Sequence, residues 1–171
     1  MIFATIVSMH PTIRAANLDD PAVRAFVEAH RTDIAPTAPD ASQHALDVAG
    51  LRSADGARVW TAHVADGLAG IIALVPLEPG HAELKSMRTA PEYRGRGVGG
   101  ALLRHALADA AHRGIGRVSL ETGSMDFFAP ARALYRRAGF IESAAFADYP
   151  ADDPHSTYMT ILLDQPPTGI A

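Results

Sequence analysis

The apolar residues of this chain change their spacing along the sequence, and the spacing predicts which segments are strands and which are helices. Val59–Ala65 and Leu68–Val75 are rich in β-branched and other apolar side chains, as is typical of strands. Asp66-Gly67 lies between them and is a strong signal for a tight hairpin turn. A third strand is expected over His81–Thr89. These segments predict a meandering, mostly antiparallel sheet.

After these strands the apolar period becomes helical. From Val98 onward apolar residues recur on one stripe until Gly114, which is expected to end the helix. The other expected elements are a strand at Thr12–Ala16, helices at Pro21–Arg31, Ala41–Leu51 and Pro130–Ala138, and strands at Arg117–Glu121, Phe140–Phe146 and Thr157–Leu163. The sequence therefore predicts an α/β (α+β) fold, with a mixed, mostly antiparallel central sheet flanked by about four helices.

The length and composition match one domain. The chain has 171 residues, of which 48% are hydrophobic, and we expect a single domain over residues 1–171. Residues 1–11 are expected to form an N-terminal extension, and residues 164–171 a tail. Charged residues or prolines interrupt every apolar run before it reaches the roughly 18 residues of a membrane span. We therefore expect no membrane segment and a cytoplasmic location.

The charge balance and residue usage exclude several classes of site. The formal net charge of −4 gives no broad basic surface for nucleic acid or an anionic membrane, so neither is an expected partner. The absence of cysteine excludes a thiolate nucleophile. The eight histidines show no His-x-x-x-His or His-Glu-x-x-His spacing, and we expect no metal site. Any anion must be held locally.

A glycine-rich segment at residues 94–99 (RGRGVG) joins the third expected strand to the long helix. Backbone N–H groups and the positive end of the helix dipole converge at such a junction, which favours phosphate binding. A Cβ at Gly97 or Gly99 would hold phosphates away from these donors. The segment lacks the ending of a Walker loop, and hairpins precede it where a dinucleotide fingerprint needs parallel strands. The sequence predicts a local pyrophosphate site.

Three linked motifs resemble the GNAT N-acetyltransferase superfamily. Arg94, Gly97 and Gly99 match its acetyl-CoA pyrophosphate motif, Gln/Arg-x-x-Gly-x-Gly/Ala. Met87–Tyr93 resembles the strand end and turn before that motif, and Ala133–Phe140 resembles the helix ending in Leu-Tyr-x-x-x-Gly-Phe. Further segments at 83–88, 120–124 and 152–156 are similar to a bacterial subgroup of acetyltransferases. The resemblance covers nearly the whole chain and implies the splayed GNAT sheet, acyltransferase activity and acetyl-CoA as co-substrate.

The resemblance also assigns roles to residues. The implied cofactor-binding residues are Met87, Arg88, Thr89, Arg94, Gly95, Arg96, Gly97, Val98 and Gly99. The spacing between Glu83 and Arg94 is similar to that of the catalytic glutamate in histone-acetylating members, so Glu83 is the predicted general base. Tyr135 resembles the tyrosine that protonates the coenzyme A thiolate and is the predicted general acid. The alternative for Glu83 is an ordinary surface glutamate paired with Lys85 or another charge. The alternative for Tyr135 is an ordinary aromatic residue of the core.

The acceptor in this fold enters over the first two helices and the loop between the last strands. Candidates by resemblance are His30, Asp33, His44, Trp60, Tyr149 and His155, of which we expect His30, Asp33 and His155 to bind substrate. The expected acceptor is a primary amine of a small molecule or amino acid. Two alternatives stay open: a catalytically silent acyl-CoA-binding regulatory module, and a protein or peptide N-acetyltransferase. Pairing of the final strands between protomers would give a homodimer.

Overall fold

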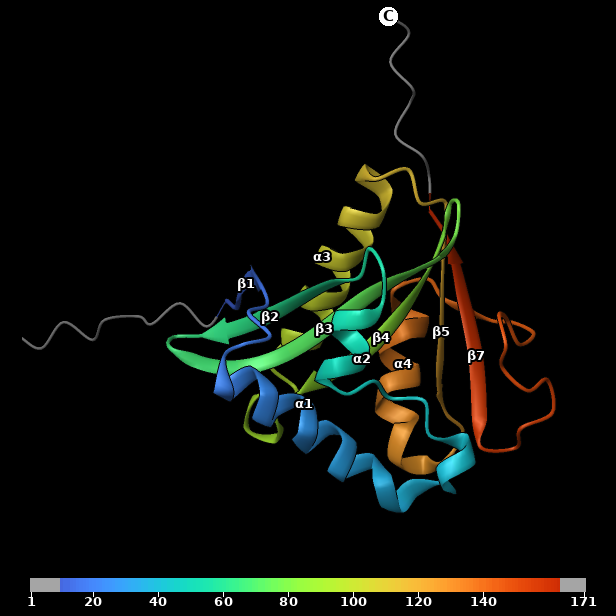
Figure 1. Ribbon diagram of the computed structural model, residues 1–171, viewed down its shortest axis with the longest axis horizontal. Helices are drawn as coiled ribbons and strands as arrows, with labels where there is room; N and C mark the ends of the chain where they lie inside the picture. Colours follow the sequence, from blue (N-terminus) through green and yellow to red (C-terminus); the bar gives the residue numbers. More distant parts are fainter. Residues whose placement is uncertain (1–9, 164–171) are drawn as a thin grey trace, which may run out of the picture.

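The computed structural model describes residues 10–163, which form one seven-stranded sheet with helices on both faces (Figure 1). The strands are β1 (Thr12–Ala15), β2 (Arg58–Val64), β3 (Gly67–Glu78), β4 (His81–Thr89), β5 (Arg117–Gly123), β6 (Ile141–Glu142) and β7 (Ser156–Leu162). Their order is β1-β2-β3-β4-β5-β7-β6. All neighbours pair antiparallel except β4 and β5. The mixed, mostly antiparallel sheet expected from the sequence is confirmed.

The parallel contact between β4 and β5 is short. Its registered pairs run only from His81 opposite Arg117 to Glu83 opposite Ser119. Beyond Glu83 the two strands have no registered pair, and they diverge in Figure 1. The sheet is therefore splayed at its centre, between two strands that both continue past the last pair.

A bulge interrupts β4 in the splayed region. The register against β3 shifts between Ile71 and Ala73, so that Ser86 and Met87 lie opposite one β3 residue. Ser86 has a φ of 54°, which is unusual for a residue with a side chain. A bulge of this kind bends a strand, and the bend lies in the part of β4 that β5 no longer pairs with.

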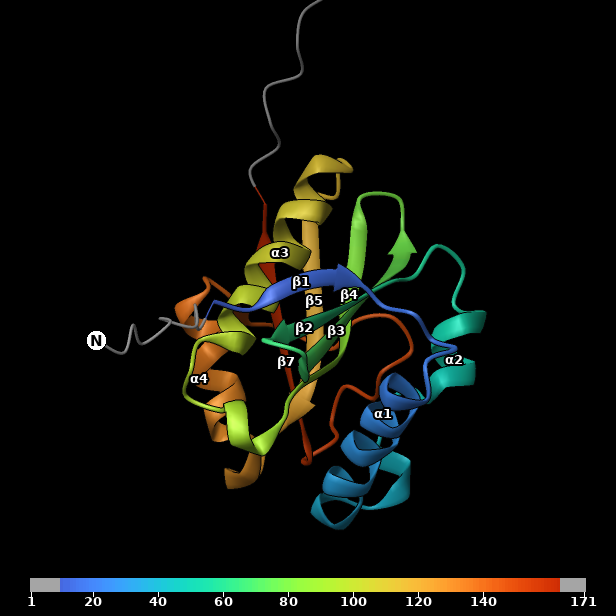
Figure 2. The ribbon, with the colours of Figure 1, turned by 90° about the vertical axis from the view of Figure 1, so that its left-hand side faces the viewer.

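Four α-helices occur between residues 10 and 163 and cover both faces of the sheet. They are α1 (Pro21–Ile34), α2 (Val48–Ser53), α3 (Val98–His112) and α4 (Ala129–Arg137). Alternate residues of β3 point to opposite faces: Ile72 belongs to the core that includes Leu102 of α3, whereas Ile71 packs with Phe26 of α1. Figure 2 shows α1 and α2 on one side of the sheet and α3 and α4 on the other. No helix of this described part is long and apolar enough to cross a membrane.

The helix expected over Ala41–Leu51 is wrong in its extent. The chain instead forms a 3₁₀ turn at Asp40–Ser42, an irregular segment, and then α2 at Val48–Ser53. The Gln43 side chain donates to two carbonyl oxygens of the preceding loop at 2.7 and 2.8 Å. Asp47 caps α2 by accepting from the Gly50 N–H at 2.7 Å. Side-chain bonds to the backbone thus replace the first turns of the expected helix.

The strand expected over Phe140–Phe146 is also too long, because β6 comprises only two residues. Beyond β6 the chain leaves the sheet and folds over its splayed centre. The Tyr149 hydroxyl donates to Glu83 of β4, and the Tyr158 hydroxyl donates to the Pro150 carbonyl at 2.6 Å. These contacts come from residues far apart in sequence, so local strand propensity did not reveal them.

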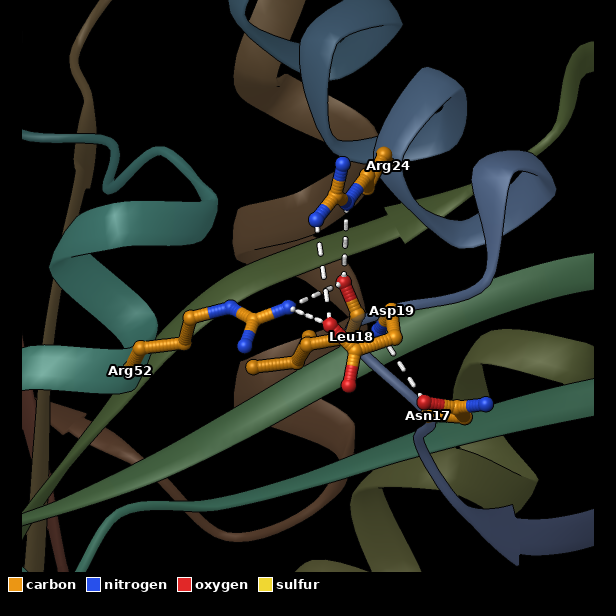
Figure 3. Close-up of polar contacts among 5 residues, drawn as sticks. All are labelled: Asn17, Leu18, Asp19, Arg24 and Arg52. Carbon is orange, nitrogen blue, oxygen red and sulfur yellow. Dashed lines mark hydrogen bonds and ion pairs between the residues drawn. The ribbon is translucent and has the colours of Figure 1, made fainter.

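A polar cluster joins the segment after β1 to the first two helices (Figure 3). Arg52 of α2 donates to the Leu18 carbonyl at 2.8 Å and to Asp19 Oδ1 at 2.5 Å. Arg24 of α1 donates to the same Leu18 carbonyl at 3.2 Å. The hydrogen bond and charge of Arg52 hold the pKa of Asp19 below its ordinary value. The cluster fixes α1 and α2 relative to each other on their face of the sheet.

Trimming one methyl group from the core is expected to lower stability measurably. Ile72 is 0% exposed and Ile141 is 67% exposed, and both lie in strands. We expect Ile72→Val to lower the free energy of unfolding by about 0.5–1.5 kcal/mol, because the lost methyl leaves a void in close-packed surroundings. Ile141→Val is the matched control and should change it by less than about 0.5 kcal/mol. Urea unfolding measures both, and equal effects would contradict the assignment of the core.

Candidate active site

The N-terminus of α3 is free of side-chain caps. Gly97 precedes the helix with φ 81° and ψ 0°, a left-handed conformation that favours glycine, and no side chain caps it. The earliest α3 N–H with a backbone acceptor in the described chain is that of Ala101, which donates to the Gly97 carbonyl at 3.0 Å. The N–H groups before Ala101 lie at the positive end of the helix dipole and can bind an anion.

These N–H groups open onto a hollow of about 620 Å³ bounded by β4, α3 and α4. This volume falls within the usual range for small-molecule sites. Eight predicted cofactor residues line it: Met87, Arg88, Thr89, Arg94, Gly95, Gly97, Val98 and Gly99. The ninth, Arg96, is not among the lining residues, and its guanidinium lies 5.9 Å from the ring centroid of Tyr93. The structure thus brings together all of the predicted set except Arg96.

Glycine is favoured at the two motif positions for different physical reasons. At Gly97 the reason is the left-handed backbone conformation, because a Cβ added there would meet nothing within 4 Å and the space beside it is open. A Cβ added at Gly99 would lie 3.2 Å from Leu134 Cδ2 and 3.3 Å from Thr89 Oγ1. Gly99 therefore also allows α3 to pack closely against α4 and β4.

A smaller cavity of about 110 Å³ adjoins the hollow where β4 and β5 separate. The two spaces share His30, Ile34, Met87, Phe128, Ala131 and Tyr135 in their walls. The polar side chains that line only the smaller cavity include Glu83, Lys85, Ser86, Glu121, Tyr149 and His155. The titratable groups of the small cavity therefore lie just across these shared residues from the large hollow.

Glu83 is buried and engaged by two partners. Its residue is 4% exposed, and its Oε1 accepts from the Tyr149 hydroxyl at 2.5 Å. The same oxygen lies 3.0 Å from Lys85 Nζ, which donates to the Tyr149 hydroxyl at 2.7 Å. Glu83 is thus paired with Lys85, as one alternative foresaw, but inside the cavity wall rather than at the surface.

Glu121 is a second carboxylate in the same cavity, and the sequence reasoning did not select it as a site residue. Its Oε1 accepts from the Ser156 hydroxyl at 2.8 Å, and within residues 10–163 no hydrogen bond reaches Oε2. Burial raises the pKa of this carboxyl to about 7. The available signal was an acidic residue in the strand Arg117–Gly123, close to the apolar Val118 and Leu120.

Tyr135 lies at the junction of the two spaces. It is buried on α4, packs near Phe140, and lines both the hollow and the small cavity. Its hydroxyl bonds to no side chain or backbone group of the described residues. Burial, and then the charge of Glu121, raise the pKa of Tyr135 above its ordinary value. Tyr135 therefore combines a core position with a phenol that keeps its proton at neutral pH.

The candidate acceptor residues are distributed unevenly. His30 lines both spaces, His44, Tyr149 and His155 line the small cavity, and Asp33 lines the large hollow. Trp60 lines neither space: it belongs to the core, and its ring lies edge-on to that of the exposed His105 at 5.3 Å between centroids. This is the packing role expected of a tryptophan on a hairpin strand.

Arg88 affects two of these residues, Asp33 and His30. Asp33 is ion-paired with the Arg88 guanidinium at 2.9 Å. Burial, and then the charge of Arg88, lower the pKa of His30 to about 4. His30 is therefore a neutral imidazole at pH 7.

Two buried polar atoms beside the small cavity have no hydrogen-bond partner among the described residues. They are His44 Nε2 and Ser86 Oγ, and both residues belong to the cavity wall. A buried polar atom without a partner costs free energy.

Comparison with known proteins agrees with this geometry. The sequence profile of the Acetyltransferase (GNAT) family matches residues 23–140. The chain is 43% identical to the uncharacterized N-acetyltransferase YedL of Escherichia coli (strain K12), over 89% of this chain and 94% of the relative. It is 40% identical to the uncharacterized N-acetyltransferase YsnE of Bacillus subtilis (strain 168), over 88% of this chain and 99% of the relative.

A solved structure gives the same answer for the fold. An acyl-CoA N-acyltransferase from Klebsiella pneumoniae superposes with a TM-score of 0.73 at 28% identity, covering 92% of this chain and all of its own. The mixed seven-stranded sheet with four helices is thus the GNAT fold, as the resemblance implied. With the family profile, two long relatives and the fold in agreement, the chain belongs to the GNAT acetyltransferase family and is an acyltransferase.

Proposed function

We propose that the protein is an acetyl-CoA-dependent N-acetyltransferase that moves an acetyl group directly to a primary amine of a small molecule or amino acid. The observation that carries the proposal is the join between the hollow at the α3 N-terminus and the small cavity. Met87 and Tyr135 belong to the walls of both. A donor held by its phosphates at α3 and an acceptor in the small cavity would meet beside these two residues.

The large hollow fits acetyl-CoA, which would supply a thioester as the acyl donor. The N–H groups of Val98, Gly99 and Gly100 would hold the pyrophosphate, and Arg94 adds positive charge at the same wall. The backbone of Met87–Thr89 in β4 would run beside the pantetheine arm. Tyr135 would protonate the departing thiolate, since it lines both spaces and its phenol retains its proton.

The small cavity supports a small amine as acceptor. Its volume of about 110 Å³ leaves room for only a few non-hydrogen atoms. The ionised Glu121 would attract an ammonium group, whereas Lys85 already pairs with the charge of Glu83. His30 and His155 would contact the acceptor from the cavity wall, and Asp33 would contact a part of it that reaches the larger hollow. We place the reaction in the cytoplasm, which the cysteine-free sequence supports.

Calorimetry followed by a turnover assay tests the proposal. We expect saturable binding of acetyl-CoA to the wild-type protein at one site per chain, because the uncapped helix end and the hollow are preformed. Screening a panel of primary amines should then reveal amine-dependent release of free thiol. A folded sample that does not bind acetyl-CoA would contradict the proposal. Binding without thiol release for any amine or peptide would favour the silent regulatory module, and release with peptides alone would favour a peptide acetyltransferase.

A further inference from the structure

Resting on the proposed function, we infer that Glu121 of β5 takes the proton from the acceptor amine, while Glu83 is a positioning residue that holds the cavity wall. The two carboxylates come from the strands that separate at the centre of the sheet, and both line the small cavity. Among the described residues neither Oε2 receives a hydrogen bond, and the two differ in the partners of Oε1. The charged Lys85 and Tyr149 contact that of Glu83, whereas only the neutral Ser156 hydroxyl contacts that of Glu121, and this difference decides the assignment.

Glu121 has a free oxygen next to the cavity. Ser156 donates to Oε1 at 2.8 Å and fixes the carboxyl group, whereas Oε2 receives no hydrogen bond from any residue between 10 and 163. A base must lie within hydrogen-bond reach of the proton that it removes. Oε2 meets the first requirement for that role, since it belongs to a wall residue of the cavity and has no competing donor.

Glu83 is occupied by donors of its own wall. Tyr149 and Lys85 both contact Oε1, and Lys85 also donates to the Tyr149 hydroxyl. Protonating Glu83 would weaken the ion pair with Lys85 at a site that is almost fully buried. The Glu83–Tyr149–Lys85 contacts instead fasten the loop after β6 to β4 and close one side of the cavity.

The surroundings of Glu121 suit a general base that works near neutral pH. Burial raises its pKa to about 7, so the carboxyl group can exchange a proton near neutrality. The titratable and charged groups around it are Glu83 and Lys85 of β4, Tyr135 of α4, Tyr149 and Asp153 of the loop before β7, and Tyr158 of β7. Glu121 also acts on the predicted acid, because its charge contributes to the raised pKa of Tyr135.

The proton balance closes with these two groups. The ionised Glu121 takes one proton from the acceptor ammonium and later releases it to solvent. The amine nitrogen then bonds to the acetyl carbon while the carbon–sulfur bond of the thioester breaks. Tyr135 gives its phenol proton to the leaving sulfur and regains one from the nitrogen, which loses its second proton. The products are the amide, the free thiol and one proton in solution.

The test compares pH profiles of kcat for wild type, Glu121→Gln and Glu83→Gln at saturating amine and acetyl-CoA. In wild type we expect kcat to rise with pH through a limb near 7, because the base must be ionised. Glu121→Gln should lose about 10²-fold at pH 7.5 and lose that limb. Glu83→Gln should keep the limb, whatever its effect on the plateau. A limb that survives in Glu121→Gln and disappears in Glu83→Gln would overturn the inference.

A second measurement is independent of turnover. A carboxyl with a raised pKa stabilises the folded state below its unfolded pKa, and this contribution is lost as pH rises toward 7. The stability of Glu121→Gln relative to wild type should therefore increase between pH 4.5 and 7.5, and a constant difference would contradict the raised pKa.

Unchanged acetyl-CoA binding shows that a variant is folded. Absence of amine turnover in wild type would contradict the proposed function itself, whereas normal turnover with an unaltered Glu121→Gln profile would overturn only this inference.

Discussion

A glutamate at position 97 is expected to weaken acetyl-CoA binding by about 10²–10³-fold. Gly97 lies directly before α3, where a Cβ would point into open space beside the uncapped N–H groups. A carboxylate there would face the pyrophosphate and occupy its donors, and like charges in such a position cost about 3–4 kcal/mol of binding free energy. Calorimetric titration of Gly97→Glu with acetyl-CoA measures the loss.

Gly80 provides the matched control for this change. It has φ of 77°, close to the 81° of Gly97, and a Cβ added there also meets nothing within 4 Å. Gly80→Glu should therefore carry the same strain of a left-handed non-glycine residue and the same charge, in the turn between β3 and β4. Equal losses of acetyl-CoA affinity in the two variants would show that the effect comes from folding or net charge and not from the phosphate site.

The second large effect is expected from Tyr135→Phe, which should lower kcat by about 10²–10⁴-fold at neutral pH. The substitution removes only a hydroxyl group that bonds to none of the described residues, so packing against Phe140 should persist. Binding of acetyl-CoA should stay within about threefold of wild type, because the substitution leaves the N–H groups at the start of α3 unchanged. Steady-state thiol release at saturating substrates measures kcat.

Tyr158→Phe separates the loss of a proton donor from the loss of a buried tyrosine hydroxyl. Tyr158 is buried on β7, and its hydroxyl donates to the Pro150 carbonyl without lining either space. Its removal should lower stability by about 1 kcal/mol and leave kcat nearly unchanged. A rate for Tyr135→Phe that equals the wild-type rate would remove Tyr135 as the general acid.

Several features were readable because their causes are local. The Asp66-Gly67 dipeptide and the apolar runs around it predicted the β2–β3 hairpin, and the structure has this hairpin. Its turn residues are Ala65 and Asp66, one position earlier than expected, and the register shifts between Ala62 and His63. The periodic stripe from Val98 predicted α3, and the glycines before it predicted an anion site at its start. Each of these depends on backbone conformation or on side chains within a few residues, and sequence neighbours are enough to specify them.

The acceptor side of the site shows where local reasoning failed. The helix expected over Ala41–Leu51 and the strand expected over Phe140–Phe146 were both too long. In each case a side chain forms hydrogen bonds that the local pattern of apolar residues does not predict. Gln43 donates to two loop carbonyls, and Tyr149 donates to Glu83. Predicted propensities describe what a segment prefers alone, and these contacts override that preference.

Contiguous stretches of chain were enough to predict the fold class, the family and the residues that line the hollow at the α3 N-terminus. The glycine-rich motif, the hairpin and the α4 motif each lie within one such stretch. The small cavity, in contrast, exists only because the chain folds. The gap between β4 and β5 places Glu83, Glu121 and Tyr135 around one cavity, although they lie on three separate elements. Their neighbours in that gap then distinguish two glutamates that are chemically identical in the sequence: Lys85 and Tyr149 contact Glu83, whereas Ser156 donates to Glu121.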